Sequence, residues 1–148
     1  MTDVFSRPKR SWIMSRVRGQ NTQPELIVRS SLHRRGHRFR LHVRELPGCP
    51  DIVLPRHRSV VFVHGCFWHG HKGCRLAALP TTRRLFWRTK FSGNARRDTL
   101  VVRRLRRLGW RVLIVWQCQT HDGERLAGRL SRFLAATSTT RSARRPTR

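Results

Sequence analysis

Two apolar segments, Ser59–His64 and Trp110–Trp116, constrain the fold of this 148-residue chain more than any other feature. Both are short and rich in Val, and the second also contains Ile and Trp, which is typical of strands buried inside a sheet. A shorter apolar run at Asp51–Leu54 is also predicted to form a buried strand. A further strand is expected at His37–His42, where apolar and polar side chains alternate.

Three helices are predicted around these strands. Thr22 and Glu25 have the spacing of a capping box, so a helix of about three turns is expected to begin there. A mostly helical stretch is expected over residues 82–108 with a break at Ser92–Asn94, and Asp122 is expected to cap a last amphipathic helix. The resulting order of elements favours an α/β fold, with a mixed central sheet flanked by helices.

The two ends of the chain differ in composition from its middle. Residues 1–21 are polar and basic and are predicted to form an arm that orders on a partner. Residues 22–135 have the length and apolar content of one domain. Residues 136–148 are rich in Ser, Thr and Arg and are predicted to be a disordered basic tail.

The charge of the chain points to a polyanionic partner. Lys and Arg number 33 against 7 Asp and Glu, so the formal net charge is +26. No apolar run approaches the roughly 20 residues needed to cross a bilayer, so no membrane association by a spanning helix is expected, nor is a secretory signal. The four cysteines do not form a dense disulfide framework, which favours a reducing compartment and roles in metal binding or in the core.

The densest cluster of reactive side chains follows the first long apolar segment. Cys66, His71 and Cys74 lie within nine residues, and Cys118 lies just beyond the last predicted strand. Two or three thiolates with one imidazole form a closed tetrahedral zinc site, and such a metal would pin the loop to the sheet. Two alternatives remain open here: the cysteines are small core residues and the histidines are solvated, or His69 replaces His71 as the ligand.

Because the chain has so few carboxylates, the position of each one is informative. Asp51 opens an apolar strand directly after a turn at Pro47–Pro50, where a carboxylate either caps the turn or holds Mg²⁺ in a cleft. His64 ends the neighbouring strand, and His69 lies in the loop that follows. A free imidazole there suits a general base for an attacking water. The alternatives are a backbone-bonded strand end for His64 and a phosphate or surface contact for His69.

Aromatic side chains are interleaved with the basic residues. Phe67 and Trp68 lie in the polar loop, and Phe86 and Trp87 lie in an Arg-rich stretch. Apolar wedges flanked by Arg suit insertion between the base steps of a duplex, and the alternative is packing on the sheet or around the metal. We expect Trp68 and Trp87 to contact DNA, and Phe86 and Trp110 to be core residues.

A series of motifs runs in unbroken order over about residues 10–120. The series comprises Met14-Ser15 with Arg18, Thr22 and Pro24-Glu25; Pro47-Gly48 with Pro50-Asp51; His64-Gly65-Cys66-Phe67-Trp68-His69-Gly70-His71; Phe86-Trp87; Asn94 with Arg97-Asp98; and Gly109-Trp110-Arg111-Val112-Leu113 with Val115-Trp116 and Cys118. Together these motifs resemble the very-short-patch-repair (Vsr) DNA mismatch endonucleases. A set this long is far more specific than any one of its motifs.

The resemblance implies a restriction-endonuclease-like fold with a structural zinc loop. It also implies Mg²⁺-dependent nicking of one DNA strand on the 5′ side of the thymine in a T·G mismatch, which arises when 5-methylcytosine deaminates. The implied partners are double-stranded DNA with that mismatch, a cytosine-5 DNA methyltransferase as a functional neighbour, and mismatch-repair proteins. A cytoplasmic, nucleoid-associated bacterial protein is expected, and a monomer, because cutting one strand needs one active site.

The resemblance further assigns roles to individual residues. Asp51 would hold Mg²⁺ together with the backbone carbonyl of Val63. The residues acting on the phosphate would be His69 as general base and His64 as an assisting group, with Glu25 and Asp98 supporting the site. The zinc ligands would be Cys66, His71, Cys74 and Cys118. The residues entering the duplex would be Phe67, Trp68 and Trp87, with Met14 on the arm assisting.

Two features depart from the patterns to which the chain is compared. The wider restriction-endonuclease fold places a second acid and a Lys after the Asp, but Val61–His64 offers neither, so the metal has one side-chain carboxylate. Gly73 lengthens the gap between His71 and Cys74 by one residue relative to the shortest family version. The rival functions are a non-catalytic zinc-containing nucleic-acid-binding protein and a same-fold nuclease with a different DNA target.

Overall fold

The computed structural model describes residues 6–15 and 19–142, with seven helices and strands in the order predicted from the sequence and one additional helix in the arm. The elements are α1 (Arg7–Ser15), α2 (Gln23–Arg34), β1 (Arg40–Leu41), β2 (Ile52–Leu54), β3 (Ser59–His64), α3 (Arg84–Arg107), β4 (Arg111–Trp116) and α4 (Gly123–Ser142). Single 3-10 turns lie at Pro55–His57, Arg75–Ala77 and Gln117–Thr120. No helix in the described part of the chain is long and apolar enough to cross a membrane.

The four strands form one mixed sheet in the order β1-β2-β3-β4. β1, β2 and β3 pair antiparallel, whereas β4 runs parallel to β3 with Ser59 opposite Arg111 and His64 opposite Trp116. A parallel pair needs a long crossover connection, and α3 supplies it. The predicted α/β fold with a mixed sheet flanked by helices is confirmed.

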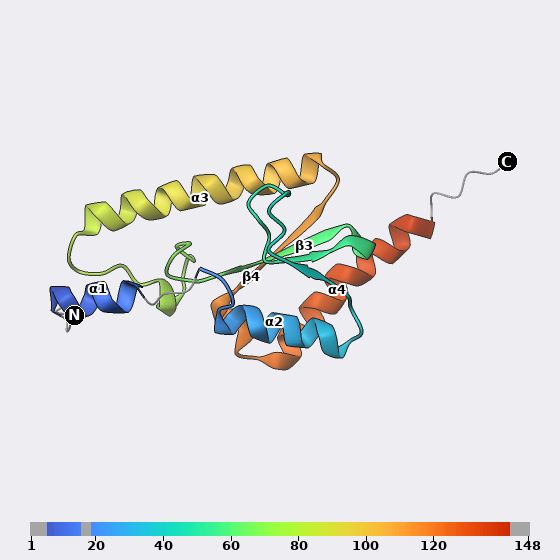
Figure 1. The fold of residues 1–148 in the computed structure, drawn as a ribbon, viewed down its shortest axis with the longest axis horizontal. Coiled ribbons are helices and arrows are strands. Elements are labelled where there is room, and N and C mark those ends of the chain that lie inside the picture. Colours follow the sequence, from blue (N-terminus) through green and yellow to red (C-terminus); the bar gives the residue numbers. More distant parts are fainter. Residues whose placement is uncertain (1–5, 16–18, 143–148) are drawn as a thin grey trace.

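The sheet is covered on both faces, as Figure 1 shows, with α3 on one side and α2 and α4 on the other. Alternate side chains of each strand point to opposite faces, so β2 and β3 contribute to two cores. One core joins the sheet to α2 and α4 through Val28, Leu32, Ile52, Leu54, Val61, Val63, Val115, Leu126, Leu130 and Leu134. The other joins it to α3 through Val53, Val60, Phe62 and Leu105, with Val101 and Trp110 packed against them.

The start of α2 confirms the predicted cap. Thr22 is the N-cap residue, and its hydroxyl accepts a hydrogen bond from the backbone N–H of Glu25 at 3.4 Å. The Glu25 carboxylate reaches back to the N–H of Asn21, one residue before the cap, at 3.0 Å. Glu25 is thereby buried and directed towards the centre of the molecule.

Three expectations about the elements need correction. The predicted break at Ser92–Asn94 is absent, and α3 is continuous through it. A glycine inside a helix costs only about 1 kcal/mol, so the helix can continue. The strand predicted over His37–His42 is limited to Arg40–Leu41, which pair with Val53 and Ile52 of β2. Helix α4 extends to Ser142, beyond the predicted domain end at residue 135.

Gly48 is expected to tolerate no side chain. Its φ is +74°, and a Cβ there would lie 2.4 Å from a methyl group of Val101 on α3. Gly36 is a matched control, since its φ is +76° and a Cβ there would meet nothing within 4 Å. Both Gly→Ala variants should lose about 1–2 kcal/mol through the left-handed backbone, and Gly48→Ala about 1–3 kcal/mol more through overpacking. Urea denaturation measures the difference, and equal losses would contradict the close contact.

Candidate functional site

A cleft of about 790 Å³ lies where β2, β3, α2 and α3 meet. Its walls include most of the residues that the sequence singled out for catalysis, together with Gly48, Cys49, Lys90 and Arg97. The side chains of interest in it are Glu25, His42, Asp51, His64, Trp68, His69 and Asp98. The structure therefore brings together residues that are separated by up to 73 positions in the chain, from Glu25 to Asp98.

Asp51 stands directly before β2 and is held by β3. Its Oδ2 accepts a hydrogen bond from the backbone N–H of Val63 at 2.7 Å. Burial raises the pKa of Asp51 to about 6 from 3.8, although the Val63 hydrogen bond opposes this rise. A carboxylate that is desolvated and has one oxygen unoccupied by a hydrogen bond is well suited to a cation, because the cation replaces the lost hydration.

Behind Asp51 lies a buried group of charged and polar side chains. Arg29 donates to the carboxylate of Glu25 at 2.9 Å and also lies 3.0 Å from Nε2 of His42. Nδ1 of His42 lies 4.0 Å from Oδ1 of Asp51. Donor atoms of Glu25, His42 and Asp51 lie within 4.8 Å of one another. The two carboxylates, 26 residues apart in the chain, thus share one corner of the cleft.

On the opposite side of the cleft, α3 orients His69. Nδ1 of His69 lies 2.7 Å from Oδ2 of Asp98. Burial opposes ionisation of Asp98, but the hydrogen bond from His69 together with the charges of His69, His64 and Arg97 outweighs it and holds the pKa of Asp98 below its usual value. An ionised carboxylate only accepts hydrogen bonds, so the shared proton belongs to Nδ1 and the lone pair is on Nε2. His69 is therefore oriented as a base.

His64 stacks against His69. The two ring centroids are 3.8 Å apart and the ring planes differ by 7°. Burial lowers the pKa of His64 to about 4, and repulsion from His69 adds to the effect. Nδ1 of His64 is buried and has no hydrogen-bond partner among the described residues. The alternative that His64 is a strand end satisfied by backbone is therefore wrong for this nitrogen.

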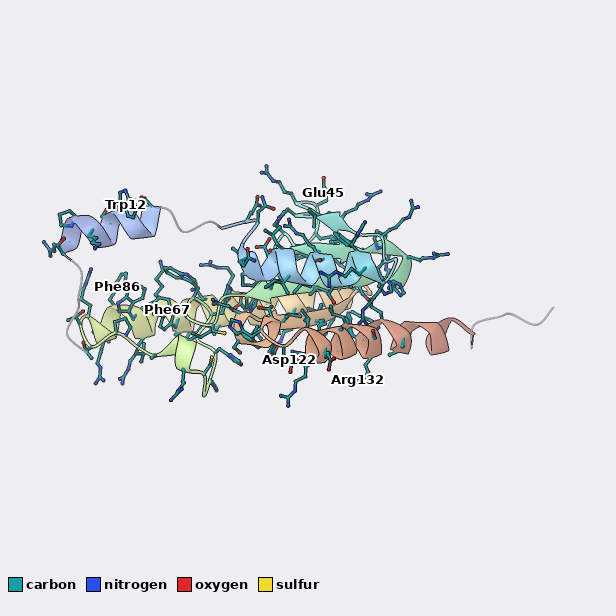
Figure 2. The ribbon with its side chains drawn as sticks, turned by 90° about the horizontal axis from the view of Figure 1, so that it is seen from below. Trp12, Glu45, Phe67, Phe86, Asp122 and Arg132 are labelled. Atoms are coloured by element: carbon teal, nitrogen blue, oxygen red, sulfur yellow. The ribbon has the colours of Figure 1, made fainter. Side chains whose placement is uncertain are left out.

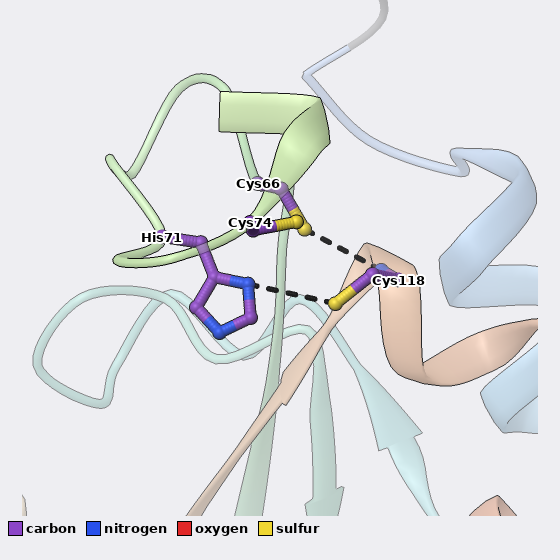
Figure 3. A group of neighbouring side chains, drawn as sticks. All are labelled: Cys66, His71, Cys74 and Cys118. Atoms are coloured by element: carbon purple, nitrogen blue, oxygen red, sulfur yellow. Dashed lines mark hydrogen bonds between the residues drawn. The ribbon is translucent and has the colours of Figure 1, made fainter. Parts of the chain in front are cut away.

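The four predicted zinc ligands come together beside this cleft, as Figure 3 shows. Cys66, His71, Cys74 and Cys118 offer donor atoms that all lie within 4.8 Å of one another. Nδ1 of His71 lies 3.5 Å from Sγ of Cys118, close to the separation of roughly 3.5 Å that bond lengths of about 2.0 and 2.3 Å imply for a tetrahedral zinc site. His71 and not His69 is grouped with the three cysteines, whereas His69 is grouped with His64 and Asp98. The donor set and its spacing fit a zinc ion.

The family model described as DNA mismatch endonuclease Vsr matches residues 2–75 of the chain. The DNA mismatch endonuclease Vsr of Escherichia coli is 43% identical over 126 residues, which cover 85% of this chain and 80% of that protein. The chain belongs to the Vsr family. The type II nicking enzymes V.XorIIP of Xanthomonas oryzae pv. oryzae and V.NmeAIP of Neisseria meningitidis are 51% and 37% identical over 134 residues, covering 90% of this chain and 98% and 95% of those proteins.

In this Vsr chain, a cluster of aromatic side chains extends from the cleft along α3. Phe67 contacts Trp68, Trp87 and Phe91 with ring centroids 5.1–5.2 Å apart. The amide of Asn94 donates to the backbone carbonyl of Trp68 at 2.8 Å and fixes the loop to the helix. Phe67, Trp68 and Trp87 thus form one half-buried group rather than separate surface residues.

The expectation that Phe86 belongs to the core is wrong. Phe86 is 46% exposed and stands at the N-terminal end of α3, near Phe67 in Figure 2. Trp110 does pack on the core beside α3, as expected. The helix α1 lies at the same end of the molecule as Phe86 (Figures 1 and 2). Met14 is within α1, but its side chain lies outside the part of the Vsr chain that the structure describes.

Three residues of the Vsr site were missed by the sequence reasoning. Arg29 lies four residues after Glu25, a spacing that signals an ion pair on one helix face. His42 lies before the turn at Pro47, and its role depends on tertiary contacts that its position in the sequence does not predict. Trp116 stacks on His71 at 4.2 Å and contacts His64 edge-on at 5.4 Å, so it joins the metal cluster to the cleft. Its position beside Cys118 was the available signal.

Replacing Asp51 by Asn should stabilise the protein at high pH in buffer free of magnesium. Folding raises the pKa of Asp51 from 3.8 to about 6, so the ionised carboxylate destabilises the folded state above pH 6, and this penalty disappears as the pH falls towards 3.8. The variant should therefore exceed the parent by up to about 3 kcal/mol at pH 8 and by little at pH 4. His64 contributes equally to both proteins and cancels in the difference. Chemical denaturation at both pH values measures the effect, and a pH-independent difference would contradict it.

Proposed function

We propose that this protein is a DNA mismatch endonuclease that nicks one strand on the 5′ side of the thymine in a T·G mismatch. The observation that carries the proposal is the cleft in which Asp51 faces the His69–Asp98 pair. The net charge of +26 favours a nucleic-acid substrate, and relatives named mismatch endonuclease or nicking enzyme support the reaction. The architecture is compatible with a restriction-endonuclease-like fold, which the proposal includes.

Asp51 and the backbone carbonyl of Val63 would hold Mg²⁺. The fit rests on the chemistry of the donors: Asp51 is half-buried, and only one of its oxygens is used by the Val63 N–H. When bound, the ion would supply Lewis-acid stabilisation of the charge that develops on the phosphate and the leaving oxygen. The Arg29–Glu25 ion pair beside it keeps the Glu25 charge balanced, so Glu25 supports the site without adding a free negative charge.

His69 is the general base of the proposed reaction. Its Nδ1–H is held by Asp98, so Nε2 is available to accept a proton from the attacking water. Asp98 then stabilises the imidazolium that forms. His64 is neutral at neutral pH, because its pKa is lowered to about 4, and it would assist at the scissile phosphate from the wall of the cleft.

Recognition of the mismatch is assigned to the aromatic cluster. Phe67, Trp68 and Trp87 would enter the duplex beside the T·G pair, with Met14 on the arm assisting. Unstacking a base step costs a few kcal/mol and costs least at a mismatch, so insertion itself favours the damaged site. Asn94, which donates to Trp68, and Asp98, which accepts from His69, lie on one face of α3. The same helix thereby positions both Trp68, which would enter the duplex, and His69, the proposed general base.

The proposed zinc ion at Cys66, His71, Cys74 and Cys118 has a structural role. It would join the loop after β3 to the segment after β4, far apart in the chain. Burial raises the pKa of the Cys66 thiol to about 12, so this thiol would release its proton to solvent only when a cation takes its place on the sulfur. The further partners that we propose are a cytosine-5 DNA methyltransferase, which creates the substrate base, and mismatch-repair proteins. We also propose that the protein is a monomer and acts at the bacterial nucleoid.

The experiment that tests the function compares duplexes that are identical except for one base. One duplex contains a T·G pair and the other a matched pair, each placed in several methyltransferase target contexts, and binding and Mg²⁺-dependent cleavage are both measured. The proposal expects cleavage of the T·G duplex alone. Binding without cleavage in any context would support a zinc-containing nucleic-acid-binding protein, and equal cleavage of both duplexes would support a nuclease with another target.

A further inference from the structure

His42 has a strained backbone beside the proposed metal carboxylate. Its φ is +47°, in the left-handed region that only a few per cent of residues other than Gly adopt. Its N–H donates to the backbone carbonyl of Asp51 at 3.3 Å, which places the imidazole against the Asp51 side chain. Strain of this kind persists only where the surroundings impose it, and it is concentrated at functional sites.

Arg29 determines which nitrogen of His42 carries the proton. A guanidinium only donates hydrogen bonds, so Nε2 of His42, 3.0 Å from the Arg29 nitrogen, must accept. The imidazole proton is then on Nδ1, which faces Oδ1 of Asp51 at 4.0 Å. The Glu25 carboxylate, 3.5 Å from the same Nε2, does not compete, because the Arg29 contact to His42 is shorter.

The carboxylate of Asp51 is therefore held at one oxygen and flanked by His42 at the other. The Val63 N–H donates to Oδ2, and Nδ1 of His42 lies beside Oδ1 at 4.0 Å, which is longer than a hydrogen bond. We propose that Arg29 and His42 are positioning residues that orient Asp51 for catalysis, an inference that rests on the function proposed above. The same tautomer prevents Nδ1 of His42 from acting as a cation ligand, although Glu25, His42 and Asp51 are grouped like a metal site.

Replacing His42 by Asn separates positioning from structure. Asn tolerates the left-handed backbone better than His does, and its side chain is too short to reach Arg29. His42→Asn should reduce the single-turnover nicking rate about 10- to 100-fold, with unchanged affinity for the T·G duplex and a melting temperature equal to or above that of the parent. Arg58→Asn is the matched control: Arg58 has φ +50° and lies outside the cleft, so nicking should be unchanged.

A spectroscopic measurement tests the tautomer without any nicking. Long-range ¹H–¹⁵N NMR of the magnesium-free protein should show the proton of His42 on Nδ1, with the signals assigned by their loss in His42→Asn. Arg29→Met should abolish this preference. A proton on Nε2 in the parent, a normal nicking rate in His42→Asn, or a parallel fall in its melting temperature and rate would each overturn the proposal. An inactive parent with the Nδ1–H tautomer would instead refute the proposed function.

Discussion

Replacing His69 by Ala should lower the single-turnover rate of nicking about 10²- to 10⁴-fold, the usual contribution of a general base. The reason is that the imidazole of His69 is oriented by a carboxylate, through the 2.7 Å contact to Asp98. Binding should not change, because the basic residues that contact phosphate remain. Rates on an end-labelled T·G duplex and affinity by fluorescence anisotropy measure the two effects separately.

Two further variants complete this test. Asp98→Asn keeps the shape but no longer favours the Nδ1–H tautomer, and should cost about 10- to 100-fold. His33→Ala removes an exposed imidazole on α2 and should leave the rate unchanged. If His69→Ala nicks as fast as the parent, His69 is not the base. If it loses binding together with nicking, His69 acts in DNA recognition instead.

Replacing Cys118 by Ser should remove zinc and destabilise the protein by about 4 kcal/mol or more, since loss of a structural metal is among the largest single-residue effects. Cys118 would contribute the ligand that joins the segment after β4 to the loop after β3 (Figure 3). Elemental analysis measures the zinc content, and thermal denaturation measures the stability.

Cys49→Ser is the matched control for the zinc prediction. Cys49 is also half-buried and free, but it lies outside the group of four ligands. This variant should keep one zinc per chain and unfold close to the parent temperature. Retention of full zinc by Cys118→Ser, or equal destabilisation by the two variants, would contradict the assignment of Cys118 as a ligand.

The elements that the sequence predicted well are those specified by local patterns. β3 was predicted with the bounds that the structure has, because Ser59–His64 is a continuous apolar run covered on both faces. The cap at Thr22 was likewise readable from a spacing of three residues. The predicted break at Ser92–Asn94 failed because a tertiary bond, from Asn94 to Trp68, outweighs the weak helix propensity of that segment.

The functional site was predictable in part for the same reason. Their positions after strands and within one loop drew attention to Asp51, His64, Cys66, His71 and Cys74, and the roles given to them are predictions that follow from the family resemblance. The roles of Arg29 and His42 were not predictable, because they depend on the left-handed backbone at His42 and on the distance from α2 to that residue. The exposure of Phe86 was missed because the local sequence does not show which face of α3 another element covers.

The most direct test of the central claim is to map the cut in a T·G duplex at single-nucleotide resolution. Each strand is labelled separately at its end, and the digestion contains Mg²⁺ and either the parent protein or Asp51→Ala. The account predicts a single nick immediately 5′ to the mismatched thymine, with no cut in the opposite strand, none in the matched duplex and none with Asp51→Ala. Cuts in both strands, a cut elsewhere, or equal cutting by Asp51→Ala would contradict it.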